Sequence, residues 1–145
     1  MGIEAIVLLF FVFIFAMQDV KEQSIDMRLI LIVTALVFVH QVALLYMGQR
    51  SLADIGLGVL PGICMVALSR ITGGKIGIGD GIIFVLLGAV QGMGRVCAVI
   101  IVSFALVAIL TLCYIPFAMA KGMRIQKKQI PFLPFIFVSM ICTMM

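Results

Sequence analysis

The stretch Gly77-Ile78-Gly79-Asp80 stands at the head of an apolar run, Gly81–Met93, and the rest of the chain is interpreted around it. A carboxylate at the edge of a membrane segment is costly to desolvate, so a functional role is the default explanation for Asp80. The flanking glycines let the backbone bend and let a second chain approach closely. We therefore expect Gly77 and Gly79 to form a non-helical lead-in to the next helix, with positive φ as one option.

The composition is that of an integral membrane protein. The 145 residues are 65% hydrophobic and 11% charged, with a mean hydropathy of +1.36. Soluble domains are closer to half apolar and a quarter charged, so this chain has too little polar surface to cover a globule. No long polar insert interrupts the sequence, and we expect one membrane-embedded domain over residues 1–145.

The apolar runs predict an all-α, polytopic membrane protein. A spanning helix needs roughly 20 mostly apolar residues, with a range of about 17–25. The first run has no basic residue ahead of it and no small-residue cleavage site after it, so we interpret it as a retained helix. Six transmembrane helices are expected, at Gly2–Gln18, Leu29–Met47, Leu52–Ser69, Gly81–Met93, Val96–Ala120 and Ile130–Met145.

Basic residues predict the orientation, because cytoplasmic loops carry an excess of Lys and Arg. Two of the ten basic residues, Arg50 and Arg95, fall in the even-numbered loops. The odd-numbered loops hold the rest, which are Lys21, Arg28, Arg70, Lys75, Lys121, Arg124, Lys127 and Lys128. The odd-numbered loops are therefore expected in the cytoplasm and both termini outside, which brings Asp19 and Asp80 to the cytoplasmic face.

Asp19 and Asp80 form the candidate catalytic pair. When two carboxylates face one water, an ionised one takes a proton from the water and a protonated one polarises the scissile carbonyl. Like charges a few ångströms apart do not both ionise easily, so the pair shares a proton. Asp26 is the rival partner for Asp80. We favour Asp19 because it abuts the first apolar helix, whereas Asp26 has the position of an N-cap before the second helix.

Other residues suggest packing or leave alternatives open. The four cysteines form no CxxC pair and His40 is the only histidine, so we expect no metal site and no cofactor. His40 and Gln41 are expected to form hydrogen bonds between helices, and Gly56, Gly58 and Gly62 to allow close helix packing. From spacing alone, a small transporter or a pilus-assembly scaffold could also place carboxylates at helix ends.

Four segments, in order along the chain, resemble the type IV prepilin and preflagellin peptidases, which are GxGD intramembrane aspartic proteases. Gly77-Ile78-Gly79-Asp80 resembles the GxGD signature, and Asp19 with Ile25 resembles the first catalytic motif. Gly88-Ala89-Val90-Gln91-Gly92 is similar to the glycine-bearing stretch that follows, and Ile130-Pro131-Phe132-Leu133-Pro134-Phe135 to a late Ile-Pro-Phe-Gly-Pro-Phe segment. The sequence departs from the family pattern at Asp26-Met27, Ile82 and Leu133.

The resemblance implies an aspartic endopeptidase of the short form, without a cysteine-rich cytoplasmic region. It would remove the short basic leader from prepilin-like or preflagellin-like precursors at the cytoplasmic side of the inner membrane. Membrane lipid is an expected partner and nucleic acid is not. Catalysis falls to Asp19 and Asp80 with support from Gly77 and Gly79, and the candidate substrate contacts are Ile130, Pro131, Phe132 and Pro134. A non-catalytic transporter, a secretion-system subunit and a GxGD protease that cuts within spanning helices remain alternatives.

Overall fold

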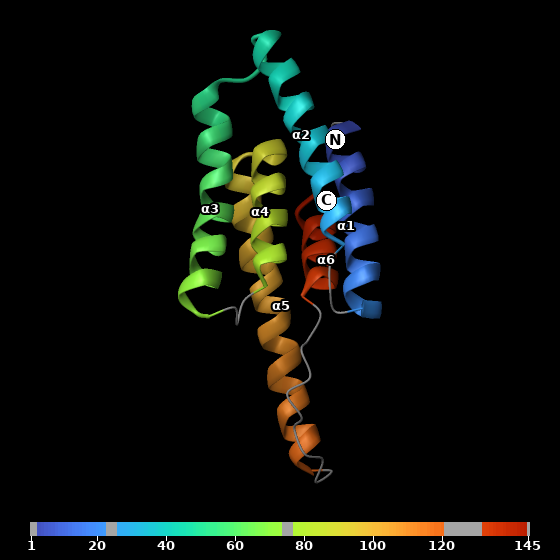
Figure 1. Cartoon of the computed structure of the whole chain (residues 1–145). Helices are drawn as coiled ribbons and strands as arrows, with labels where there is room; N and C mark the ends of the chain where they lie inside the picture. The colour runs from blue at the N-terminus through green and yellow to red at the C-terminus, as the bar shows by residue number, and fades with distance from the viewer. Residues whose placement is uncertain (1–2, 23–25, 74–76, 121–131, 145) are drawn as a thin grey trace.

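The structure is a computed structural model that describes residues 3–22, 26–73, 77–120 and 132–144. Within these ranges the chain is all-helical, with six helices that run up and down the long axis of an elongated bundle (Figure 1). Their bounds are α1 Ile3–Glu22, α2 Met27–Tyr46, α3 Leu52–Ile71, α4 Ile78–Gln91, α5 Met93–Ala120 and α6 Leu133–Met144. The described part of the chain therefore confirms the predicted fold class as all-α.

The helix bounds differ from the predicted spans where the site residues lie. The first helix continues to Glu22, so Asp19 lies inside its last turns and not beyond its end. The fourth helix begins at Ile78, so Asp80 lies in its first turn. By length and composition, α2, α3 and α5 up to Tyr114 are able to cross a membrane, whereas α4 and α6 are shorter apolar helices.

Helix α4 forms the centre of the bundle. It packs most extensively on α3 and also contacts α1, α2 and α5, while α6 packs on α1 and α5. Phe84 and Leu87 of α4 are fully buried, as are Ile136 and Met140 of α6. The remaining surfaces of the long helices are rich in exposed apolar side chains, which is typical of helices that face lipid.

Glycines allow α3 and α4 to approach closely. Gly58 and Gly62 lie one turn apart on α3, and both are buried against α4. A Cβ built on Gly58 would collide with the carbonyl of Gly88, and one built on Gly62 would lie 2.6 Å from the Cα of Val85. Small residues at such spacing let membrane helices pack backbone to backbone. The close-packing prediction is confirmed for these two glycines and wrong for Gly56, which has open space around it.

Side-chain contacts link the remaining helices. The ring of Phe13 on α1 packs against Phe137 on α6, with centroids 5.2 Å apart. The hydroxyls of Ser103 on α5 and Ser139 on α6 form a buried hydrogen bond of 2.6 Å. Both contacts hold α6 between α1 and α5, so the first turn of this short helix has a fixed place at one end of the bundle.

An apolar groove of about 430 Å³ separates α1 from α2, with Glu4 and His40 among its lining residues. His40 Nε2 lies 3.5 Å from Glu4 Oε1 of α1, so this histidine contacts another helix, and its predicted hydrogen bond stays a prediction. Gln41 is buried, but its amide has no hydrogen-bond partner among the described residues. The expected interhelical hydrogen bond from Gln41 is therefore wrong for this structure.

The Gly62→Ala variant is expected to lower the stability of the protein, because its Cβ has to push α3 away from the backbone of α4. Overpacking of this kind costs roughly 1–3 kcal/mol. Gly56→Ala is the matched control on the same helix, since nothing lies within 4 Å of its added Cβ. Thermal unfolding in detergent measures both variants, and equal melting temperatures would show that α3 and α4 do not pack at Gly62.

Candidate active site

Asp19 lies on the inward face of α1. Val12 and Phe15 are buried, and they precede Asp19 by seven and four residues, a spacing that puts all three on one side of the helix. The carboxyl group is consequently half-buried at the end of the bundle where α1 finishes. Asp19 reaches the interior because it lies on the same buried face of α1 as these apolar residues.

The carboxylate of Asp19 contacts the N-terminus of α6. The Leu133 N–H donates a hydrogen bond to Asp19 Oδ2, with 3.2 Å between nitrogen and oxygen. The first N–H groups of a helix have no acceptor within it and need one from elsewhere. Asp19 supplies that acceptor across 114 residues of sequence, so α1 and α6 meet at this carboxylate.

Asp80 occupies the third position of α4, where a negative charge is favoured by the helix dipole. Its carboxylate turns back over the N-cap, since a Cβ built on Gly77 would lie 2.8 Å from Asp80 Oδ2. The group is half-buried and accepts no hydrogen bond from the described residues. The charge of Asp19 acts on Asp80, so the two carboxylates interact electrostatically across α1 and α4.

The predicted glycine lead-in is correct at Gly77 and wrong at Gly79. Gly77 is the N-cap, with an extended backbone at φ −62° and ψ 127°, whereas Gly79 belongs to the first turn of the helix. Among the described glycines, positive φ occurs at Gly48, Gly73 and Gly92. Gly77 is therefore needed for the space that it leaves to the Asp80 carboxylate and not for an unusual backbone angle.

The late proline segment lies next to the aspartates. The ring of Phe132 packs against Phe104 of α5, with centroids 5.3 Å apart, and against Phe84 of α4 at 6.2 Å. Pro134 lies in the first turn of α6. Ile130 and Pro131, the other two candidate substrate contacts, lie outside the described residues. The structure thus gives this segment a role that the sequence did not suggest, as the carrier of the Leu133 N–H.

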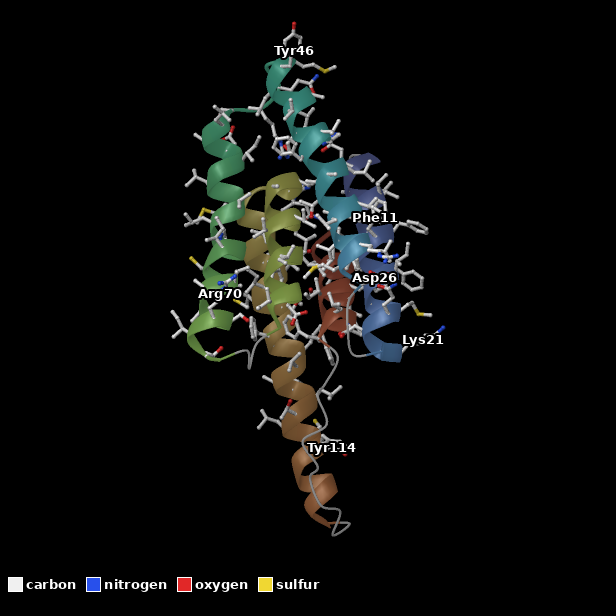
Figure 2. All side chains as sticks on the ribbon, in the orientation of Figure 1. Phe11, Lys21, Asp26, Tyr46, Arg70 and Tyr114 are labelled. Carbon is white, nitrogen blue, oxygen red and sulfur yellow. The ribbon has the colours of Figure 1, made fainter. Side chains whose placement is uncertain are left out.

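Asp26 is engaged elsewhere. It is the N-cap of α2, and its Oδ1 accepts a hydrogen bond of 3.0 Å from the Arg28 N–H. Its residue is exposed, and Figure 2 shows it beside the start of α2. The predicted capping role is confirmed, which leaves Asp19 as the carboxylate that interacts with Asp80.

Arg50 holds the opposite end of α4 and was not singled out by the sequence. Its guanidinium donates to the carbonyl oxygens of Ala89, at 2.7 Å, and Val90. A cation at a helix C-terminus satisfies free carbonyls and complements the dipole. Arg50 therefore fixes the end of α4 that is remote from Asp80, and the separation of 39 residues between Arg50 and Ala89 left no local sequence signal for this contact.

Metal ligands do not gather in the part of the chain that the structure describes. No group of three or more His, Cys, Asp or Glu side chains lies close enough there to hold an ion. The four cysteines, Cys64, Cys97, Cys113 and Cys142, are free thiols distributed over α3, α5 and α6. The chemistry available in the described site is that of two carboxylates.

We compared the sequence with models of known protein families. The model of the type IV leader peptidase family matches residues 6–112, which contain both Asp19 and Asp80. The chain belongs to the type IV leader peptidase family. No curated protein sequence and no solved structure matched the chain. This leader peptidase therefore has its candidate pair inside the matched region and its Leu133 contact beyond it.

Replacing Gly77 by Ala is expected to slow leader-peptide cleavage by about 10-fold or more. The Cβ would crowd Asp80 Oδ2, and a displacement of about 1 Å in a reacting group costs up to about 100-fold. Stability should change little, since a carboxylate can rotate away and Ala adopts φ −62° readily. Gly94→Ala, with open space around it, is the control. The measurement is the rate of leader-peptide cleavage by each variant, and equal rates would contradict the crowding argument.

Proposed function

We propose that this leader peptidase is an aspartic endopeptidase that removes the short basic leader from type IV pilin-like precursors. The observation that carries the proposal is the convergence of Asp19 and Asp80 from separate helices at one end of the bundle, where their charges interact. The family supports peptidase activity in general. Two carboxylates are the groups in the described site that can activate water.

The geometry supports a mechanism without a covalent intermediate. One carboxylate takes a proton from water while the water oxygen attacks the scissile carbonyl carbon. The other carboxyl group donates its proton to the carbonyl oxygen, which gives a neutral tetrahedral intermediate. The C–N bond then breaks as the nitrogen accepts a proton from the first aspartic acid. The second carboxylate takes a proton from a hydroxyl of the intermediate as the product carboxyl group forms, so the pair again carries one proton. General acid and base steps of this kind each contribute roughly 100- to 10,000-fold.

The family supports a prepilin-type substrate in general, and the arrangement of the bundle is compatible with such a precursor. A precursor with a basic leader and an adjoining apolar helix can place the helix in lipid and the leader at the polar end of the bundle. Figure 2 shows Lys21 and Arg70 towards the same end of the bundle and Tyr46 at the opposite end. Arg50 lies at that opposite end through its contacts with α4. This distribution supports an inner-membrane protein with the aspartates towards the cytoplasm.

The Asp19→Asn and Asp80→Asn variants are each expected to reduce cleavage by at least about 100-fold, because Asn keeps the size but cannot exchange a proton. Asp26→Asn should retain substantial activity, since Asn caps a helix as well as Asp does. The assay is cleavage of a co-expressed pilin-like precursor, with the product mass giving the cut site. An inactive Asp26→Asn beside an active Asp19→Asn would reject the assignment of the pair, and cleavage unaffected by all three would reject aspartic catalysis.

The proposed orientation predicts which loops face the cytoplasm. In a variant with its native cysteines replaced by Ser or Ala, a cysteine at Arg70 should react with an impermeant maleimide from the cytoplasmic side. A cysteine at Arg95 should react from the opposite side. Inverted membrane vesicles and intact cells give the two readings. Labelling of both positions from one side would break the six-span topology.

A further inference from the structure

We propose that the N-terminus of α6 is the positioning element for Asp19, and that the Leu133 N–H leaves Asp19 Oδ1 as the oxygen that takes the proton from water. The inference rests on the proposed function, because it assigns the base within the aspartate pair. It starts from the hydrogen bond of 3.2 Å between the Leu133 nitrogen and Asp19 Oδ2.

The first turn of α6 has an unusual set of donors. Pro134 has no N–H, and the N–H of Phe135 already donates to the Phe132 carbonyl at 3.0 Å. The N–H of Ile136 donates to the same carbonyl at 3.3 Å. Leu133 therefore presents the N–H of this turn that depends on a side chain from another helix. Because the proline at the next position has no N–H, Leu133 is the residue in the described first turn of α6 that donates to Asp19.

The donor is held in place by packing. Leu133, Ile136 and Met140 are all fully buried along one face of α6. The hydrogen bond between Ser139 and Ser103 ties the same helix to α5. The Leu133 nitrogen cannot move without disturbing these contacts, so it serves as a fixed reference for the carboxylate of α1.

The carboxylate of Asp19 is consequently held by a hydrogen bond, whereas that of Asp80 is not held by one from the described residues. The Leu133 N–H uses one lone pair of Asp19 Oδ2, whereas Asp19 Oδ1 accepts no hydrogen bond from the described residues and is the freer oxygen for a water between the aspartates. Asp80 accepts no hydrogen bond from the described residues and can reorient. This asymmetry fits Asp19 as the base that takes the water proton onto Oδ1. Asp80 is then the acid that gives its proton to the carbonyl oxygen of the substrate.

Two variants of one residue separate the N–H from the side chain. Leu133→Pro removes the donor, at a first helical position that tolerates proline. Leu133→Ala removes most of the buried side chain and keeps the donor. We expect kcat of Leu133→Pro to lie about 10- to 100-fold below that of Leu133→Ala, with similar KM, because misorientation affects the chemical step more than substrate binding. Equal kcat values would overturn the proposal.

A backbone ester at position 133 provides the second variant, because it replaces the N–H by oxygen and keeps the leucine side chain. The ester should reproduce the loss of kcat seen in Leu133→Pro. A wild-type kcat in a correctly inserted ester variant would overturn the proposal even if Leu133→Pro failed to fold.

A stability cycle tests the contact without any use of activity. Asp19→Ala should lower the melting temperature in the wild-type background and have a smaller effect in the ester background, where the hydrogen bond is already absent. Additive losses would overturn the positioning contact. If the cycle shows coupling while Asp19→Asn still cleaves precursor, the proposed function fails and the contact stands. If Asp19→Asn is inactive but the cycle is additive, the positioning contact fails and the proposed function stands.

Discussion

Helix ends that lie inside an apolar bundle need hydrogen-bond partners, and this requirement shapes the site. Lipid offers no donors or acceptors, so free N–H and C=O groups must be satisfied within the protein. At 14 and 12 residues, α4 and α6 are about 21 and 18 Å long, well short of the roughly 30 Å hydrocarbon core. Arg50 serves the C-terminus of α4 and Asp19 serves the N-terminus of α6. Because α6 is short, its N-terminus lies inside the bundle, and the carboxylate of Asp19 lies there to accept its hydrogen bond.

The same arrangement makes two neighbouring acids tolerable. Asp80 lies in the first turn of α4, and Asp19 bonds to the first turn of α6, so both carboxylates are near the positive ends of helices. Close packing of α3 on α4 at Gly62 determines where the first of these ends lies. The serine pair between α5 and α6 determines the second. Packing along α4 and α6 therefore helps to position the two helix ends that carry these carboxylates.

Short-range sequence patterns predicted the helices and one N-cap of this chain. They did not predict contacts between segments that are far apart in the sequence. Apolar runs gave the helices, and the position of Asp26 gave its N-cap, because both depend on neighbours in sequence. Gly79 proved helical since a helix start can include glycine when a neighbouring residue, Gly77, provides the N-cap. The bond between Asp19 and Leu133 depends on how α1 and α6 are packed, and no motif in either segment encodes that distance.

The depth of the site follows from α5. Phe104 packs against Phe132, next to the Leu133–Asp19 contact, so the aspartates lie at the level of Phe104. The apolar part of α5 continues for ten more residues to Tyr114, a rise of about 15 Å, and extends past the other helices (Figures 1 and 2). Ile109 and Leu112 are exposed on this extension, which is typical of a surface that faces lipid. The site therefore lies beside a helix whose exposed surface is apolar, and the N-termini of α4 and α6 supply polarity next to Asp80 and Asp19.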